Sequence, residues 1–228
     1  MAYEVKKRTI NSIWIYLVAT IWIFVSMLAS SNGFAGNLYE YMLSGNTGVD
    51  FDSNTIDIPW NWFVYWVTFT LVIMASNHFN HDLNIQLLIR SKKRKYRWNR
   101  LYFGVLATAL FLSTVFIIIF IVYDYTFGDS LSGVCFAISI YMSGLTLGEI
   151  INILIIRFDE IFALIGACAC MAISIFISTP WLPMDGSMLI RSNMYSVELY
   201  VLNLAANIVT MILIYLYGNY YFCKKEEL

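Results

Sequence analysis

The stretch LYFGVLATALFLSTVFIIIFIVY, residues 101–123, contains no charged residue and is dominated by apolar side chains. An α-helix needs about 20 such residues to cross the hydrocarbon core of a bilayer, which is about 30 Å thick. A chain in lipid must also pair its own backbone N–H and C=O groups, as a helix does. This segment therefore predicts a transmembrane helix.

Further charge-free runs of the same character lie on both sides of it, at 9–39, 58–81, 130–148, 161–184 and 199–223. Because these runs are continuous rather than alternating, they favour helices over a β-barrel. The spans are expected at about 11–31, 59–78, 102–123, 131–155, 161–179 and 199–221. The predicted fold class is an all-α polytopic membrane protein with six transmembrane helices, forming a single domain over residues 1–228.

The composition excludes several other classes of protein. Hydrophobic residues make up 60% of the 228 residues and charged residues only 13%, about half the ~25% of a typical soluble domain. So little charge cannot cover the surface of a soluble enzyme, and so much apolar surface does not fit a disordered chain or a coiled coil.

The few charges are unevenly placed along the chain. With six spans, both termini lie on one side of the membrane, and that side carries 13 of the 14 Lys and Arg residues, all except Arg191. Basic loops stay in the cytoplasm. We therefore expect both termini to be cytoplasmic in a multi-pass protein of the cell membrane.

Half of the basic residues fall in one expected cytoplasmic segment, residues 79–100. Seven Lys and Arg lie between Arg90 and Arg100, and apolar residues at helical spacing precede them. Tyr96 and Trp98 suit the lipid headgroup layer. The segment is interpreted either as an anchor on anionic lipid or as a short helix that docks a cytoplasmic partner.

Polar residues inside the spans are candidate functional groups. Glu149 lies in the inner part of the fourth span, either as a structural group that reaches the surface or pairs with Arg157, or as a gating contact. Asn203 and Asn207 share one face of the sixth span. That face fits interhelical hydrogen bonds or the lining of a pathway.

Aromatic residues mark the start of the second span. Trp60 and Trp62 fit the outer aromatic belt of a membrane protein. Tyr65 and Trp66 lie deeper and fit either packing or the lining of a path for an amphipathic substrate.

Two features belong to the fifth span and the loop after it. Gly166 and Ala167 lie in a run of small residues, which predicts close helix packing within the chain or across a dimer. The following loop, 179–193, is apolar enough to dip into the outer leaflet as a hairpin, with Arg191 at the surface.

No catalytic motif is recognisable in the chain. It has no G-x-x-x-x-G-K-[ST], G-x-S-x-G or H-E-x-x-H. His78 and His81 lack further ligands at zinc spacing. We therefore expect no enzymatic activity, bound metal or cofactor in this chain, and no nucleic-acid partner.

The six spans, the LLIRSKKRKYRW segment at 87–98 and the hairpin at 180–193 resemble the permease subunits of ABC-2-type ABC exporters. The small size is similar to Gram-positive exporters of antimicrobial peptides, bacteriocins or phenol-soluble modulins. The N-terminal amphipathic helix of that family is short here, at about residues 3–12. The resemblance implies a bacterial origin and a short amphipathic coupling helix between the second and third spans.

The resemblance also implies partners. Separate P-loop ATPase subunits would carry ATP and Mg²⁺, and a second permease subunit, identical or homologous, would complete the pathway for an amphipathic peptide or other hydrophobic substrate. The residues expected to contact the ATPase are Ile85, Leu88, Ile89, Arg90, Lys92, Lys93, Arg94, Arg97, Asp159 and Glu160. Those expected on the pathway or interface are Tyr16, Thr20, Tyr65, Trp66, Glu149, Gly166, Ala167, Asn203 and Asn207.

Other functions stay open at this point. A membrane scaffold or sensor without transport activity would use the same basic segment to recruit a partner. A small secondary transporter requires an ionisable site at mid-membrane and commonly shows inverted repeats. Only Glu149 approaches such a site, and no repeat is visible in the sequence.

Overall fold

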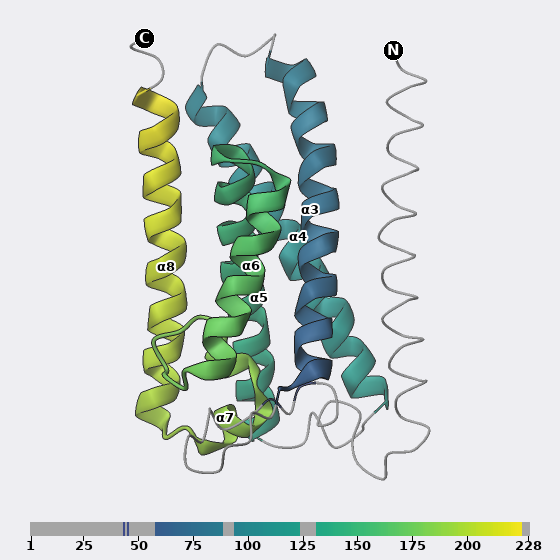
Figure 1. Cartoon of the computed structure of the whole chain (residues 1–228), viewed down its shortest axis with the longest axis vertical. Helices are drawn as coiled ribbons and strands as arrows, with labels where there is room; N and C mark the ends of the chain where they lie inside the picture. Colours follow the sequence, from purple (N-terminus) through teal and green to yellow (C-terminus); the bar gives the residue numbers. More distant parts are fainter. Residues whose placement is uncertain (1–42, 44, 46–57, 89–93, 124–130, 225–228) are drawn as a thin grey trace.

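The structure is a computed structural model that describes residues 43, 45, 58–88, 94–123 and 131–224. In this part of the chain every regular element is helical, as Figure 1 shows. The elements are α3 (Trp60–Leu88), α4 (Arg94–Tyr123), α5 (Leu131–Arg157), α6 (Glu160–Phe176), the 3-10 turn η2 (Asp185–Ser187), α7 (Leu189–Met194) and α8 (Val197–Lys224).

The five long helices coincide with the second to sixth predicted spans, so the all-helical class is confirmed for the described residues. Among the described residues, three helical stretches are long and apolar enough to cross a membrane, namely Trp98–Ile118, Gly133–Arg157 and Val197–Tyr221. Trp60–Ser76 and Glu160–Phe176 are shorter apolar helices. The first predicted span, 11–31, lies outside the described residues, so the six-span topology stays a prediction.

Helices α3 and α4 extend beyond their predicted spans. Helix α3 continues ten residues past position 78 to Leu88, and α4 begins at Arg94 rather than near 102. The described parts of segment 79–100 are therefore the end of α3 and the start of α4, not a separate short helix. No Gly or Pro occurs between 79 and 100 to interrupt the helices.

The bundle has two distinct ends, visible in Figure 1. The end of α3, the start of α4 and the end of α8 lie together at what we call the basic end. Helix α7 lies at the opposite end, called the loop end. The described part of the basic cluster, at the start of α4, and the 177–196 loop therefore lie at opposite ends of the helices.

Helix α5 is the centre of the bundle. It contacts α3, α4, α6 and α8. In the most apolar stretch of α5, 56% is buried inside the bundle, against 11% in the corresponding stretch of α8. The core between these helices combines aliphatic and aromatic side chains, with Trp66 and Phe69 of α3, Phe116 of α4 and Phe136 of α5 all buried. The side chains that such a bundle leaves outside are apolar too.

The outer surface of the described helices agrees with the membrane character that the composition suggests. Large apolar side chains are exposed on α4, α6 and α8, among them Phe103, Phe111, Ile165, Ile212 and Leu216. An apolar surface this extensive is unusual for a soluble monomer. It suits contact with lipid.

A two-residue connection sets the turn between α5 and α6. The Phe158 amide still donates to the Leu154 carbonyl, which extends the hydrogen bonds of α5 by one residue (2.9 Å). Asp159 then adopts an extended backbone, and its Oδ1 accepts a hydrogen bond from the Phe162 amide at 2.9 Å. This is the N-cap that an α-helix favours, and it reverses the chain direction without a longer loop.

Candidate functional site

The 177–196 loop is the most highly organised irregular segment of the described chain. Residues 184–188 are buried, with η2 packed against α5 and α8. The loop predicted as a hairpin is folded against the bundle through η2 and α7, while its dip into the outer leaflet stays a prediction. The prediction that Arg191 lies at the surface is wrong, since its side chain is only 1% exposed.

Arg191 is buried because acceptors surround its guanidinium. It forms an ion pair with Asp185 and donates to the carbonyls of Ser174 and Ile175, the latter at 3.0 Å. These carbonyls belong to the last turn of α6, where they lack helical partners. The cation thus closes the end of α6 and ties the loop to it, a pairing that the sequence pattern did not reveal.

Asp185 receives a second donor, because the Tyr195 hydroxyl hydrogen-bonds its other carboxylate oxygen. Burial raises the pKa of the Asp185 carboxyl, while the Tyr195 hydrogen bond and the Arg191 charge oppose that rise. The carboxylate is therefore held by two groups that the same loop supplies. Removing either donor leaves a buried charge less compensated.

Asn203 and Asn207 anchor the first half of the loop to α8. The Asn203 amide donates to the carbonyls of Pro180 and Leu182, each at 3.0 Å. The Asn207 amide donates to the Pro183 carbonyl at 3.3 Å, and its oxygen accepts from Thr146 of α5 at 2.7 Å. Of the two interpretations of this polar face, hydrogen bonding is the one that the structure displays.

Helix α3 also reaches the loop. Trp62 was expected in the aromatic belt, but it is buried and its Nε1 donates to Ser187 Oγ at 3.1 Å. Trp60, by contrast, is 64% exposed, as a belt residue would be. On the α8 side, a Cβ at Gly186 would lie 2.5 Å from Asn203 Oδ1, so the loop approaches too closely for any larger residue.

Glu149 is fully buried within α5. Asn152 donates to its Oε2 at 3.2 Å, while Oε1 has no hydrogen-bond partner in the described part of the chain. The carboxyl therefore does not reach the surface or pair with Arg157, as one interpretation of the sequence expected. Glu149 stays buried because it lies on the face of α5 that points toward the centre of the bundle.

At the basic end, Trp98 joins α4 to α8. Its ring is buried rather than in the headgroup layer, and its Nε1 donates to the Tyr215 carbonyl at 3.1 Å. A Cβ at Gly218 would lie 2.1 Å from the Trp98 ring. The lone glycine within the apolar sixth span was the signal that could have indicated this contact.

The residues expected to contact an ATPase either lie at or toward the basic end or fall outside the residues that the structure describes. Ile85 and Leu88 belong to the last turns of α3, and Arg94 and Arg97 to the first turns of α4; their side chains are not described. Asp159 and Glu160 cap and begin α6. Outside the described residues lie Ile89, Arg90, Lys92 and Lys93, as do Tyr16 and Thr20 of the expected pathway.

The remaining pathway candidates are packed inside the bundle. Tyr65 and Trp66 are buried, with the Tyr65 ring 4.6 Å from that of Phe116 and 4.9 Å from that of Trp66. Ala167 is buried, and a Cβ at Gly166 would lie 2.5 Å from Leu154 of α5. Gly166 therefore serves close packing within the chain.

Comparison of the chain with protein-family models, curated proteins and solved structures found no match. In the part of the chain that the structure describes, every regular element is helical and three helices are long and apolar enough to cross a membrane. Its polar interior is concentrated at the loop end and around Glu149.

Proposed function

We propose that this chain is the permease subunit of an ATP-driven exporter of the ABC-2 type, located in the cell membrane. It would move an amphipathic substrate outward, a peptide fitting best, together with separate P-loop ATPase subunits and a second permease subunit. The single observation that carries this proposal is the basic end, where α3 and α4 continue past their apolar spans toward a cluster of seven basic residues.

Helix length supports a projection beyond the membrane. Helices α3 and α4 have 29 and 30 residues, about 43 and 45 Å at 1.5 Å per residue. The hydrocarbon core is only about 30 Å thick. Since the cations between Arg90 and Arg100 require water or headgroups, the excess length belongs on the cytoplasmic side. These projecting helix ends offer a rigid surface that a cytoplasmic partner could bind and move.

The α5–α6 connection supplies a second contact point. It lies toward the basic end but stops short of the α3 and α4 ends (Figure 1). Asp159 and Glu160 there are exposed carboxylates beside exposed Arg157. A partner that grips α3 and α4 would meet this shorter turn next to them.

The hydrogen bonds at the loop end favour a concerted movement of the helices. The loop links the ends of α6 and α8 to α5 and α3 through buried hydrogen bonds. Closure of the ATPase dimer on the basic end would then move these helices as a unit and change the space between two permease copies. The apolar outer face of α6 and the first span are the surfaces proposed for that pairing.

Charge reversal tests the docking proposal. In the tagged full-length chain, the double substitution Arg94→Glu and Arg97→Glu should lower the amount of P-loop ATPase recovered from native membranes about tenfold or more, because like charges at an interface repel. Arg94→Lys with Arg97→Lys keeps the charge and should retain binding. Lys224→Glu reverses a single charge at the end of α8 and should lower ATPase recovery less than the double substitution on α4. Unchanged ATPase recovery and unchanged export in the Glu variant would contradict the proposal.

The alternative is a membrane scaffold or sensor without transport activity. It is favoured by one observation, the use of Asn203 and Asn207 in internal hydrogen bonds rather than on an open path. Adding purified chain to its ATPase separates the two functions. A permease should make ATP hydrolysis depend on substrate, whereas a scaffold should leave the hydrolysis rate independent of substrate.

A further inference from the structure

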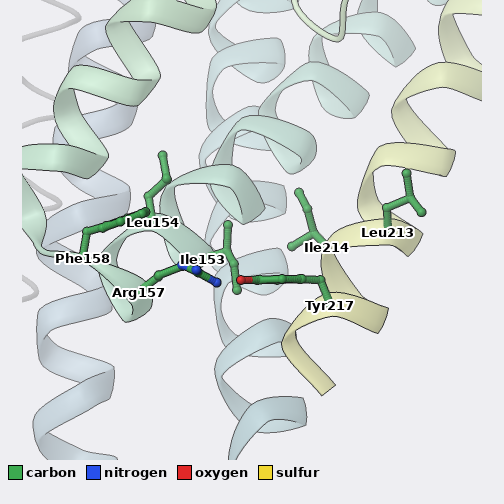
Figure 2. A pocket seen from close by; sticks show the side chains of 7 residues that line it. All are labelled: Ile153, Leu154, Arg157, Phe158, Leu213, Ile214 and Tyr217. Atoms are coloured by element: carbon green, nitrogen blue, oxygen red, sulfur yellow. The ribbon is translucent and has the colours of Figure 1, made fainter. Parts of the chain in front are cut away.

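A groove lies between the basic-end halves of α5 and α8. It is lined by Ile153 and Leu154 of α5 and by Leu213 and Ile214 of α8, and Figure 2 shows Ile153 and Ile214 between the two helices. Its volume is about 320 Å³, at the lower end of the range for ligand pockets. These four side chains make it an apolar slot that opens on the outer surface of the bundle.

One cation lies at this slot. Arg157, at the last position of α5, is exposed, and its guanidinium lies 5.6 Å from the ring centroid of Tyr217. It lies 5.8 Å from the rings of Phe158 and Tyr221. Within the described residues no carboxylate forms an ion pair with it. The rings hold the guanidinium by cation–π attraction, and the exposure of Arg157 makes it accessible to an anionic ligand.

We infer that this groove binds an anionic phospholipid of the surrounding membrane, with its phosphate on Arg157 and part of one acyl chain in the slot. Arginine presents a fork of donors that matches phosphate geometry. The slot provides no polar group for a more hydrophilic ligand, because its lining apart from Arg157 and the Tyr217 hydroxyl is hydrocarbon.

Two features favour lipid over a peptide or a second copy of the chain. Helix α8, which forms one wall of the groove, also exposes Val209, Ile212 and Leu216. These side chains are ones that lipid would cover in a membrane. The positive charge at the groove also repels a cationic peptide. Because the inference uses only α5 and α8, it does not depend on ATP-driven transport.

Lipid retention by the purified full-length chain tests the inference. After delipidation, the chain is mixed with phosphatidylglycerol and phosphatidylcholine of identical acyl chains, and bound lipid is counted by native mass spectrometry. The wild type should prefer phosphatidylglycerol. Arg157→Gln should reduce that preference about fivefold, as expected for one cation near an anionic surface at about 1 kcal/mol. Arg157→Lys keeps the charge but loses the fork of donors, and should therefore keep only part of the preference.

Two controls separate the groove from general charge effects. Arg100→Gln removes an exposed cation on α4 at the same end and should leave the preference unchanged. Ile214→Trp fills the slot and should lower retention of both lipids while the protein stays monodisperse. A preference that survives Arg157→Gln, or is lost equally in Arg100→Gln, would overturn the inference. So would a second copy of the chain that competes with lipid and depends on Arg157.

Discussion

At the scale of single residues, the buried charges distinguish this bundle from a purely apolar one. Asp185 and Arg191 satisfy each other together with Tyr195 and the carbonyls at the end of α6. Glu149 has only Asn152 as its hydrogen-bond partner among the described residues. These two sites should therefore respond differently to loss of charge.

Arg191→Met should destabilise the protein strongly. The substitution keeps the bulk of the side chain but leaves Asp185 buried without its cation and frees the α6 carbonyls. Breaking one side of a buried pair costs about 3–5 kcal/mol. Thermal unfolding in detergent measures the loss, with Arg100→Met as the exposed control. Adding Asp185→Asn should recover part of the stability. An unfolding temperature equal to the wild type would show that the pair is not structural.

Glu149→Gln should be tolerated. Glutamine has the same shape, can accept the Asn152 hydrogen bond and avoids a charge where no described cation compensates it. We expect a change in unfolding free energy within about 1 kcal/mol. Glu149→Ala should cost more, about 2 kcal/mol or above, because it leaves a cavity. Equal destabilisation by both substitutions would mean that the charge itself is needed.

The contacts of single residues could be predicted only in part from the sequence. Two asparagines four apart in an apolar span indicate a shared polar face, and Asn203 and Asn207 indeed bond together to one loop. The burial of Arg191 could not be predicted, because several of its acceptors are backbone carbonyls. These carbonyls are free to accept its hydrogen bonds only because α6 ends near Ile177. Trp98 was misplaced for a similar reason, since its partner Gly218 is more than 100 residues away.

At the scale of elements, five helices followed from charge-free apolar runs. Such runs mark the part of a helix that suits hydrocarbon, not the helix itself. The polar extensions of α3 to Leu88 and of α4 back to Arg94 were therefore missed. Helix contacts were not predictable from the runs either, except where small residues such as Gly166 and Ala167 indicated close approach.

The α4–α8 contact should be sensitive to side-chain size at Gly218. The side chain of Gly218→Val would occupy space that the Trp98 ring now fills, so α4 and α8 must move apart at the basic end. Overpacking of this kind typically costs about 1–3 kcal/mol. Unfolding measurements should show this loss and its partial rescue by Trp98→Ala. Ala205→Leu, on an exposed position of the same helix, should be neutral. A neutral Gly218→Val would contradict the described contact.

At the scale of the whole molecule, the distribution of charge organises the protein. A folded loop closes one end of the bundle around a buried ion pair, and the other end carries most of the Lys and Arg residues that the structure describes. Apolar side chains cover the helices between them. This arrangement suits a membrane protein that receives a cytoplasmic partner at one end and keeps the other end rigid.

Site-specific photo-crosslinking tests the central claim, that the basic end docks an ATPase, most directly. A photoreactive amino acid is placed at Tyr96, in the first turn of α4, and in a second variant at Trp181, an exposed loop residue near the opposite end. Both full-length variants are irradiated in native membranes, and the products are identified by mass spectrometry. The account predicts a crosslink from position 96, but not from 181, to a P-loop ATPase. Equal capture from both positions, or no ATPase from position 96, would contradict it.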